Sequence, residues 1–246
     1  MKSNVKYIHT SRIHNMAAPR IIVKHILEFI NPKSVVDFGC GVGTFLKAFT
    51  EKNINNVLGL DGPWADKNLM ANYLELENFK EVDLEKEIIL DQKYDLAISL
   101  EVAEHLSETS ADTLVKNLTQ SSDVILFSAA IPFQGGQNHI NEQFVDYWEN
   151  KFLKHQFVFI DVIRSKIWNE KEVNWWYKQN TFLVINKQKL STINLGVYPL
   201  VNNTLIHPDH YIAKNVDHKN FRLGKGRTKV YIKLVVKSIL YKLKLI

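Results

Sequence analysis

The sequence has little that would tie it to an oxidising compartment or to the interior of a membrane. Cys40 is its only cysteine, which excludes an internal disulfide framework and fits a reducing cytoplasm. No uninterrupted apolar run approaches 18 residues, so we expect no transmembrane helix. Residues 1–15 lack the apolar segment of a secretory signal, and we therefore expect a cytoplasmic protein. Internal repeats and low-complexity segments are also absent from the sequence.

Charge is distributed unevenly along a chain of otherwise ordinary composition. Its 246 residues are 46% hydrophobic and 23% charged, which suits one α/β domain with additions and a sizeable core. The net charge is +5, and much of the excess lies in the last 30 residues. This distribution predicts an acidic partner or surface for the C-terminal part without identifying it.

Short apolar runs alternate with helical patterns along most of the chain. Such alternation indicates an α/β, Rossmann-like fold with a seven-stranded, mostly parallel sheet, whose ligands bind beyond the carboxyl ends of the strands. We expect an N-terminal arm over 1–16, this domain over 17–190 and a C-terminal extension over 191–246. Helical patterns cover 19–30, 44–52, 66–77, 111–118 and 142–153. The predicted strands are 34–37, 57–61, 79–83, 94–100, 124–128, 157–163 and 181–185.

The most informative stretch is a glycine-rich turn after the first predicted strand. It reads Asp37-Phe-Gly39-Cys-Gly41-Val-Gly43, and a helical pattern begins directly behind it. Glycine allows a positive φ and removes the Cβ atoms that would keep a ligand away from the backbone. The free N–H groups of the following helix point back at such a ligand. The spacing differs from the G-x-G-x-x-G of dinucleotide folds. The alternative to a ligand-binding turn is an ordinary tight turn between a strand and a helix.

This D-x-G-x-G-x-G pattern resembles motif I of the class I S-adenosylmethionine (SAM) methyltransferases. A carboxylate at Asp61, which ends the second predicted strand, can accept both hydroxyls of a ribose, or it caps the turn that follows. The resemblance implies that Asp83 reaches the adenine amino group, although an N-cap role fits it equally well. The cofactor-binding residues implied are Asp37, Gly39, Gly41, Gly43, Asp61, Asp83, Leu100 and Glu101.

A second group of polar residues follows the fourth predicted strand. If residues 101–105 form a helical turn, Glu101, Glu104 and His105 share one face. His139 comes from the loop after the neighbouring strand. Two carboxylates and two imidazoles suit Mg²⁺ or Mn²⁺, and a bound cation would lower the pKa of a substrate hydroxyl.

The same group carries a second resemblance. The pattern E-x-x-E-H with a later histidine resembles the motif of two groups of metal-assisted enzymes, the small-RNA 3′-terminal ribose 2′-O-methyltransferases and the ubiquinone-pathway O-methyltransferases. The resemblance implies that the metal ligands are Glu101, Glu104, His105 and His139. E-H-L also occurs in metal-free SAM enzymes, where the histidine is structural or a base. Without a metal, His139 or His105 is the best candidate for a general base. The candidate catalytic residues are therefore His139, His105 and Glu104.

The loop 128–142 bears on the identity of the acceptor. It contains Gly135-Gly136 and polar side chains that can hydrogen-bond a polyhydroxylated substrate. Together with the aromatic residues behind it, this loop resembles bacterial methyltransferase-domain proteins associated with surface-glycan gene clusters. The resemblance implies a sugar hydroxyl of a nucleotide-sugar, capsule or other glycan precursor as the methyl acceptor. The residues that carry it are Gln134, Gln137, Asn138, His139, Asn141, Glu142, Tyr147, Trp148, Trp168, Trp175, Trp176, Tyr177, Gln179 and Asn180.

The end of the chain predicts a basic amphipathic helix over 229–246. Such a helix suits the anionic inner face of a membrane, and packing on the domain or on a partner subunit is the alternative. The oligomeric state stays open. His207-Pro-Asp-His210 is expected to be loop rather than a metal site.

These observations predict a SAM-dependent O-methyltransferase that acts on a sugar. An RNA ribose 2′-O-methyltransferase is the first alternative, but the central loop is not rich in Lys and Arg, which argues against nucleic acid. The second alternative is a non-catalytic SAM-fold protein that acts as a binding or assembly partner. The intact turn, Asp61 and the group around Glu104 argue against such a loss of activity.

Overall fold

The computed structural model describes residues 15–196 and 203–245. The chain divides into two compact units, Met1–Leu205 and Ile206–Ile246, and each is described by itself. Of the predicted arm over 1–16, only Asn15 and Met16 belong to the described residues.

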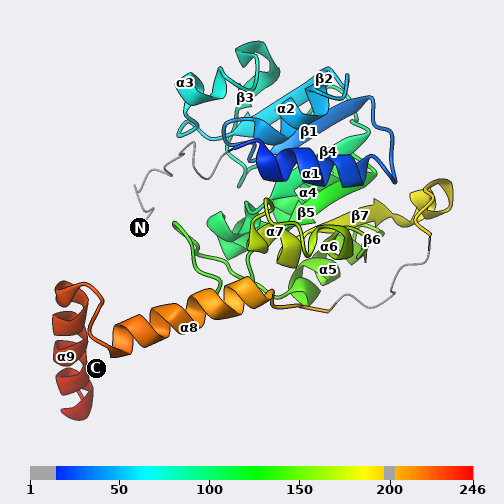
Figure 1. Cartoon of the computed structure of the whole chain (residues 1–246). Coiled ribbons are helices and arrows are strands. Elements are labelled where there is room, and N and C mark those ends of the chain that lie inside the picture. Colours follow the sequence, from blue (N-terminus) through cyan, green and yellow to red (C-terminus); the bar gives the residue numbers. More distant parts are fainter. Residues whose placement is uncertain (1–14, 197–202, 246) are drawn as a thin grey trace. The chain divides into compact units, whose positions relative to one another are not determined.

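The first unit is built on a single seven-stranded sheet (Figure 1), which confirms the predicted fold class. The strand order is β3-β2-β1-β4-β5-β7-β6, and only β7 runs antiparallel to its neighbours. The order reverses between β1 and β4, which is where ligands bind in sheets of this kind. The strands are β1 (Ser34–Phe38), β2 (Asn56–Asp61), β3 (Phe79–Glu81), β4 (Leu96–Leu100), β5 (Val124–Ser128), β6 (Phe157–Ile160) and β7 (Phe182–Asn186).

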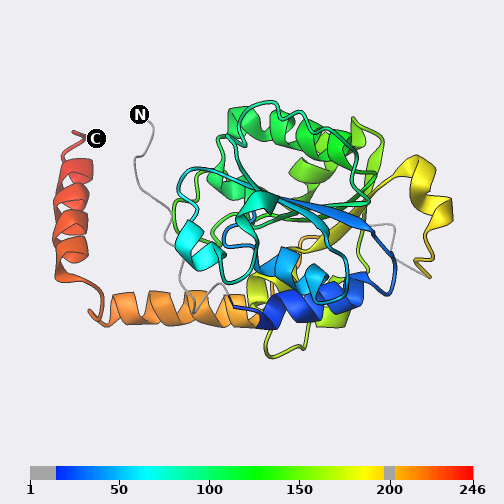
Figure 2. The same ribbon diagram turned by 90° about the horizontal axis from the view of Figure 1, so that it is seen from above.

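Helices cover both faces of the sheet, as Figure 2 shows for the blue helix α1 and the green helix α4 on opposite sides. The helices of the first face are α1 (Ala17–Ile26), α2 (Thr44–Thr50), α3 (Lys67–Met70), α6 (Arg164–Ile167) and α7 (Trp175–Asn180). The helices of the second face are α4 (Ala111–Ser121) and α5 (Val145–Leu153).

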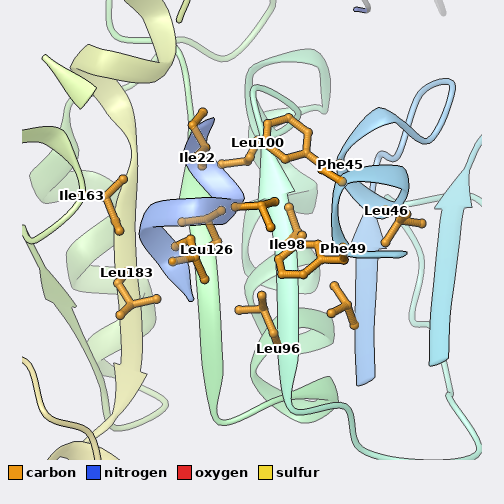
Figure 3. Packing of buried hydrophobic residues seen from close by; sticks show 14 of the residues in the cluster. Ile22, Phe45, Leu46, Phe49, Leu96, Ile98, Leu100, Leu126, Ile163 and Leu183 are labelled. Carbon is orange, nitrogen blue, oxygen red and sulfur yellow. The ribbon is translucent and has the colours of Figure 1, made fainter. Parts of the chain in front are cut away.

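The buried core follows the two-residue period of the strands. Leu96 and Ile98 of β4 pack with the first set of helices, whereas Ala97 between them packs with the second set. Figure 3 shows the first cluster, in which Ile22 and Phe49 are fully buried against the sheet. Burying a side chain of this size stabilises the fold by about 1.5–3 kcal/mol. The core therefore fixes the strand ends from which the site is built.

Two predicted helices are shorter than their sequence patterns indicate. The helix predicted over 66–77 is present only as α3, which Asp66 caps by accepting from the amides of Asn68 and Leu69, and as a short 3₁₀ helix at Leu76–Asn78. The helix predicted over 142–153 begins at Val145. Its expected first residue, Glu142, is instead part of the preceding loop.

The second unit contains α8 (Pro208–Arg222) and α9 (Thr228–Lys242). The expectation of a loop at 207–210 is wrong, because His207 caps α8 through its ring nitrogen and Pro208 begins the helix. The predicted helix over 229–246 is confirmed as far as Lys242; residue 246 lies outside the described residues. Among the described residues, no helix has both the length and the apolar character needed to cross a bilayer.

Candidate active site

The glycine turn joins β1 to α2 in the conformation that its sequence predicts. Gly39, Gly41 and Gly43 have φ values of 83°, 56° and 85°, which disfavour residues with a Cβ. A Cβ on Gly39 would lie 2.4 Å from a methyl carbon of Val102, and one on Gly43 would lie 2.8 Å from Leu74. The turn is therefore confined by its neighbours as well as by its own backbone.

Asp61 ties this turn to the end of β2. Its carboxylate accepts hydrogen bonds from the amides of Gly41 at 2.8 Å and Gly62 at 2.6 Å. Burial raises the pKa of Asp61 to about 6, although these amides and the Trp64 side chain oppose the rise. Asp61 thus lies beside the glycine turn, at the place predicted for a ribose-binding carboxylate.

Asp37 is the second carboxylate under the turn, in β1. Only 3% of its surface is exposed, and burial together with the nearby charge of Asp61 raises its pKa to about 8. Burial also raises the pKa of the Cys40 thiol well above its usual value. This agrees with the interpretation of Cys40 as a small filling residue rather than a nucleophile.

The other two predicted cofactor positions differ in character. Leu100 ends β4, is buried, and lies near Phe45 in the packing of Figure 3. Asp83 follows β3, accepts from the amide of Glu85 at 3.1 Å and pairs with Lys86 at 3.2 Å. Asp83 thus caps a turn rather than the helix N-terminus weighed for it, and a role at adenine stays a prediction.

Glu101 leaves β4 in an unusual conformation. Its φ of 54° places it in the left-handed region, and its amide donates to the backbone oxygen and the hydroxyl of Ser128. Its carboxylate accepts from the side-chain amides of Gln134 at 2.8 Å and Asn180 at 3.1 Å. Burial raises the pKa of Glu101, and these hydrogen bonds oppose the rise.

The helical turn over 101–105 on which a shared face depended is therefore present only in part. Only Ala103–His105 forms a 3₁₀ turn, and the left-handed conformation of Glu101 itself leaves its carboxylate bonded to the side-chain amide of Gln134. Glu104, His105 and His139 nevertheless come together, with one ligand atom of each within 4.8 Å of the others. Glu101 is not part of this group, so its role as a metal ligand stays a prediction.

Glu104 is the central residue of the group. It is fully buried, and neither carboxylate oxygen has a hydrogen-bonding partner of ordinary geometry among the described residues. Burial and the charge of Glu101 raise its pKa well above the usual value, and nearby backbone amides offset this only in part. An ionised carboxylate in such a place is costly unless a cation neutralises it.

Two histidines complete the group. The Nε2 atom of His139 lies 4.0 Å from a carboxylate oxygen of Glu104, and its ring meets that of His105 edge to face at 4.8 Å. Burial and the neighbouring His139 lower the pKa of His105 to about 4. His105 is therefore neutral at pH 7, which is the form that binds a metal ion.

Glu142 orients His139. Its carboxylate lies 2.8 Å from Nδ1 of His139 and also accepts from the amide of Gly135 at 2.6 Å. Because an ionised carboxylate only accepts hydrogen bonds, Nδ1 donates to Glu142, and Nε2 is the ring atom that faces Glu104. A carboxylate behind a histidine in this way is common at metal sites.

The loop that carries His139 is closely packed. The backbone oxygen of Glu104 accepts from the amides of Ile140 and Asn141, at 2.9 and 3.1 Å. A Cβ on Gly136 would lie 2.1 Å from Nε2 of His139, so only glycine fits there. The position of His139 is therefore set from both sides of the loop.

The donor set fits a hard or borderline divalent cation. Glu104 supplies a buried carboxylate that has no hydrogen-bonding partner of ordinary geometry in the described part of the chain. His105 supplies a neutral imidazole, and His139 supplies a second imidazole, which Glu142 holds in place. Carboxylate and imidazole ligands are typical of Mn²⁺ and related ions. The sequence analysis did not assign roles to Glu142, Gln134 or Asn180 individually. For Glu142, the available signal was its position three residues after His139 in a loop rich in polar side chains.

Known proteins resemble this chain in two ways. A family model described as a methyltransferase domain matches residues 12–186. Among solved structures, the fold is similar to a proposed O-methyltransferase from Nostoc punctiforme, with a TM-score of 0.50, 15% identity and coverage of 70% of this chain and 57% of that one. It is also similar to Streptomyces venezuelae DesVI, with a TM-score of 0.51, 13% identity and coverage of 71% and 93%.

Human N-acetylserotonin methyltransferase in complex with SAM is a third similar structure. It has a TM-score of 0.47 and 14% identity, and the match covers 69% of this chain and 51% of the human one. The chain thus spans only about half the length of this protein and of the Nostoc protein. No curated protein sequence matches the chain. At these identities, the solved structures show a shared fold and nothing finer.

Proposed function

This chain belongs to the methyltransferase-domain family, and on that premise we propose that it moves the methyl group of SAM to a hydroxyl of a sugar, with a divalent cation held at Glu104. The observation that carries the proposal is the group formed by Glu104, His105 and His139, at the same edge of the sheet as the glycine turn. A SAM-binding turn alone would fit any acceptor. A buried carboxylate and two imidazoles at the carboxyl ends of the strands favour an oxygen acceptor, because a hydroxyl must lose its proton.

The cofactor assignment rests on the turn and on Asp61. The positive φ values at Gly39 and Gly43 give the turn the backbone conformation that glycine favours, and the absence of Cβ atoms lets the turn pack closely against Val102 and Leu74. Asp61 reaches this turn from β2. In its ionised form it has acceptor capacity left for the ribose hydroxyls of SAM.

For the cation, we assign Glu104, His105 and His139 as protein ligands and Glu142 as the residue that orients His139. When bound, such a cation acts as a Lewis acid that lowers the pKa of a hydroxyl and holds it in place. The protein's own part is to align that oxygen with the methyl carbon and to exclude water. If no cation is bound, Nε2 of His139 is the atom placed to receive the hydroxyl proton instead.

The sugar acceptor is supported by charge and by the polar loop. Residues 1–205 contain 21 Lys and Arg against 24 Asp and Glu, so the unit that holds the site has an excess of acidic residues. An RNA substrate needs phosphate contacts from basic side chains, and this unit is poorly supplied with them. A glycan or nucleotide-sugar places less demand on positive charge and more on hydrogen bonding.

A transfer assay with SAM tests the proposal. Nucleotide-sugars, glycans and small RNAs are incubated with SAM and with Mn²⁺, Mg²⁺ or EDTA, and the methylated products are identified by mass spectrometry. We expect methylation of a sugar hydroxyl that EDTA suppresses and that Glu104→Gln abolishes, while the exposed control Glu75→Gln keeps full activity. Activity unchanged by EDTA would contradict the cation, and methylation of RNA alone would contradict the sugar.

A further inference from the structure

Helix α9 presents apolar side chains that no other described residue of the second unit covers. None of its residues is buried, although more than half are large and apolar. In a soluble helix, an apolar face of this size normally packs against another element. The exposed apolar residues of α9 and the turn after it are Val230, Ile232, Leu234, Val235, Val236, Ile239, Tyr241, Leu243 and Leu245.

Four of the five lysines of residues 229–246 gather on one side of the helix. At 100° per residue, Lys229, Lys233, Lys237 and Lys244 fall within an arc of about 80°. Val235 and Ile239 lie on the other side, within a much broader and mainly apolar arc whose one charged residue is Lys242. The segment therefore has a basic stripe along one edge of a mainly apolar surface.

The charge around α9 has a single sign. Residues 218–246 contain nine Lys and Arg and no Asp or Glu. This segment therefore has no acidic residue with which a second copy could balance its charge, so pairing two copies would bring like charges together. A surface rich in negative charge is the complementary partner.

The turn before α9 is held in a defined form. Tyr231 donates its hydroxyl to the backbone oxygen of Phe221 at 2.7 Å and accepts from the amide of Gly226 at 2.8 Å. Its ring stacks on that of Phe221 at 4.8 Å. Gly224, with φ of 72°, ends α8. These contacts join the two helices at one end and leave Val235 and Ile239 exposed.

The length of α9 limits what it can bind. Its 15 residues span about 22 Å, which is less than the ~30 Å thickness of a bilayer's apolar core. It also holds only about two heptads, fewer than the three or four that indicate a coiled coil. A short, basic and broadly apolar helix suits the boundary between lipid headgroups and acyl chains.

We propose that α9 binds an anionic phospholipid surface, with the lysine stripe at the headgroup phosphates and the Val235–Ile239 side inserted among the acyl chains. This contact does not depend on the methyl acceptor. It would hold the catalytic unit at a membrane, where lipid-linked substrates are found.

Co-sedimentation of the full chain with vesicles tests this inference. Binding is compared between vesicles of pure phosphatidylcholine and vesicles that also contain phosphatidylglycerol. Its share is 25–30%, which is roughly the fraction of anionic lipid that gives a clear surface potential. We expect binding to the anionic vesicles only, weakened by salt. Replacing Lys229, Lys233, Lys237 and Lys244 with glutamine should reduce affinity at least about 100-fold, since each lysine near such a surface contributes about fivefold.

Two further variants distinguish insertion of α9 from a general attraction between a basic protein and an anionic surface. Glutamine at Lys33, Lys52, Lys80 and Lys171 removes the same charge from the first unit and should leave binding unchanged. Val235→Gln with Ile239→Gln should weaken binding at least about tenfold, because it removes buried apolar area. Circular dichroism and thermal unfolding are measured for every variant as the check on folding.

Three results would overturn the inference. These are equal binding to neutral and anionic vesicles, wild-type binding by the Val235→Gln/Ile239→Gln variant, and a dimer in light scattering that this variant dissociates. Because vesicle binding is read without any methyl transfer, its failure is separate from a failure of the proposed activity.

Discussion

Nε2 of His139 faces a buried carboxylate oxygen of Glu104 at a distance of 4.0 Å. The gap is too long for a hydrogen bond, and the Glu104 carboxylate has no hydrogen-bonding partner of ordinary geometry among the described residues. A group arranged in this way destabilises the protein by itself and becomes favourable when a cation lies between the two side chains. This relationship connects the stability of the fold to the proposed chemistry.

Glu104→Gln should therefore separate stability from metal binding. We expect the melting temperature without metal to be equal to or above that of the wild type, because a neutral side chain avoids the cost of a buried charge. Mn²⁺ at about 100 times its Kd should stabilise the wild type by about 2.7 kcal/mol and leave the variant unchanged. Thermal unfolding with and without Mn²⁺ measures both effects, with Glu75→Gln as the exposed control. A variant that is still stabilised by Mn²⁺ would contradict the site.

Glu142→Gln should weaken metal binding without removing a ligand. The carboxylate fixes the Nδ1 proton and the ring orientation of His139, and losing such support typically costs about 10–100-fold in metal affinity. Calorimetric titration with Mn²⁺ measures the change. An unchanged affinity would mean that His139 is oriented by the loop backbone alone.

Gly39→Ala tests the confined glycine turn. The new Cβ would meet Val102 at 2.4 Å and would also require a φ of 83°, so we expect a loss of about 2–4 kcal/mol of unfolding free energy together with SAM binding. Gly196→Ala is a matched control, because its φ is 64° and nothing lies within 4 Å of its Cβ position. It should lose only about 1–2 kcal/mol.

Adding Val102→Ala to Gly39→Ala should recover part of the stability but not the whole, since the backbone strain stays. Chemical denaturation measures all of these values. Equal effects at Gly39 and Gly196 would show that close packing around the turn is unimportant.

The pKa of about 8 at Asp37 predicts how stability without SAM depends on pH. A carboxyl whose pKa is raised in the folded state binds more protons folded than unfolded between about pH 4 and pH 8. The stabilisation that Asp37 gives to the folded state is thus present at low pH and is lost as pH rises through 8. Asp61, with a pKa of about 6, adds the same sign of change at lower pH. The melting temperatures of the wild type and of Asp37→Asn are measured from pH 5 to 8.5. As pH rises, the melting temperature of the variant should fall less steeply than that of the wild type. Parallel curves would mean that Asp37 does not titrate in this range.

The parts predicted from sequence are those set by local periodicity. Apolar runs of five or so residues predicted the seven strands, and the glycine spacing predicted the turn at Gly39–Gly43. These features depend on residues close together in the chain. Their conformation therefore follows from short-range sterics and from the burial of alternating side chains.

The parts not predicted depend on contacts between distant segments. Glu101 would share a face with Glu104 and His105 only in a helical turn, but Gln134 and Asn180, 33 and 79 residues away, hold its carboxylate elsewhere. Glu142 was expected to begin a helix, but its bonds to His139 and to the amide of Gly135 keep it in the loop. Neither arrangement is visible in a helical or strand period, because each is decided by tertiary hydrogen bonds.

Binding of S-adenosylhomocysteine, the product of every SAM-dependent transfer, is the decisive measurement for the proposed cofactor site. Isothermal titration of the full chain should show one site per chain, with competition by SAM. Asp61→Asn should weaken binding about 10–100-fold, since hydrogen bonds to a charged group are worth about 1.5–3 kcal/mol. The variant's melting temperature checks that the turn is intact. No binding by the folded wild-type chain, or equal binding by the folded Asp61→Asn variant, would contradict the assignment of SAM to this turn.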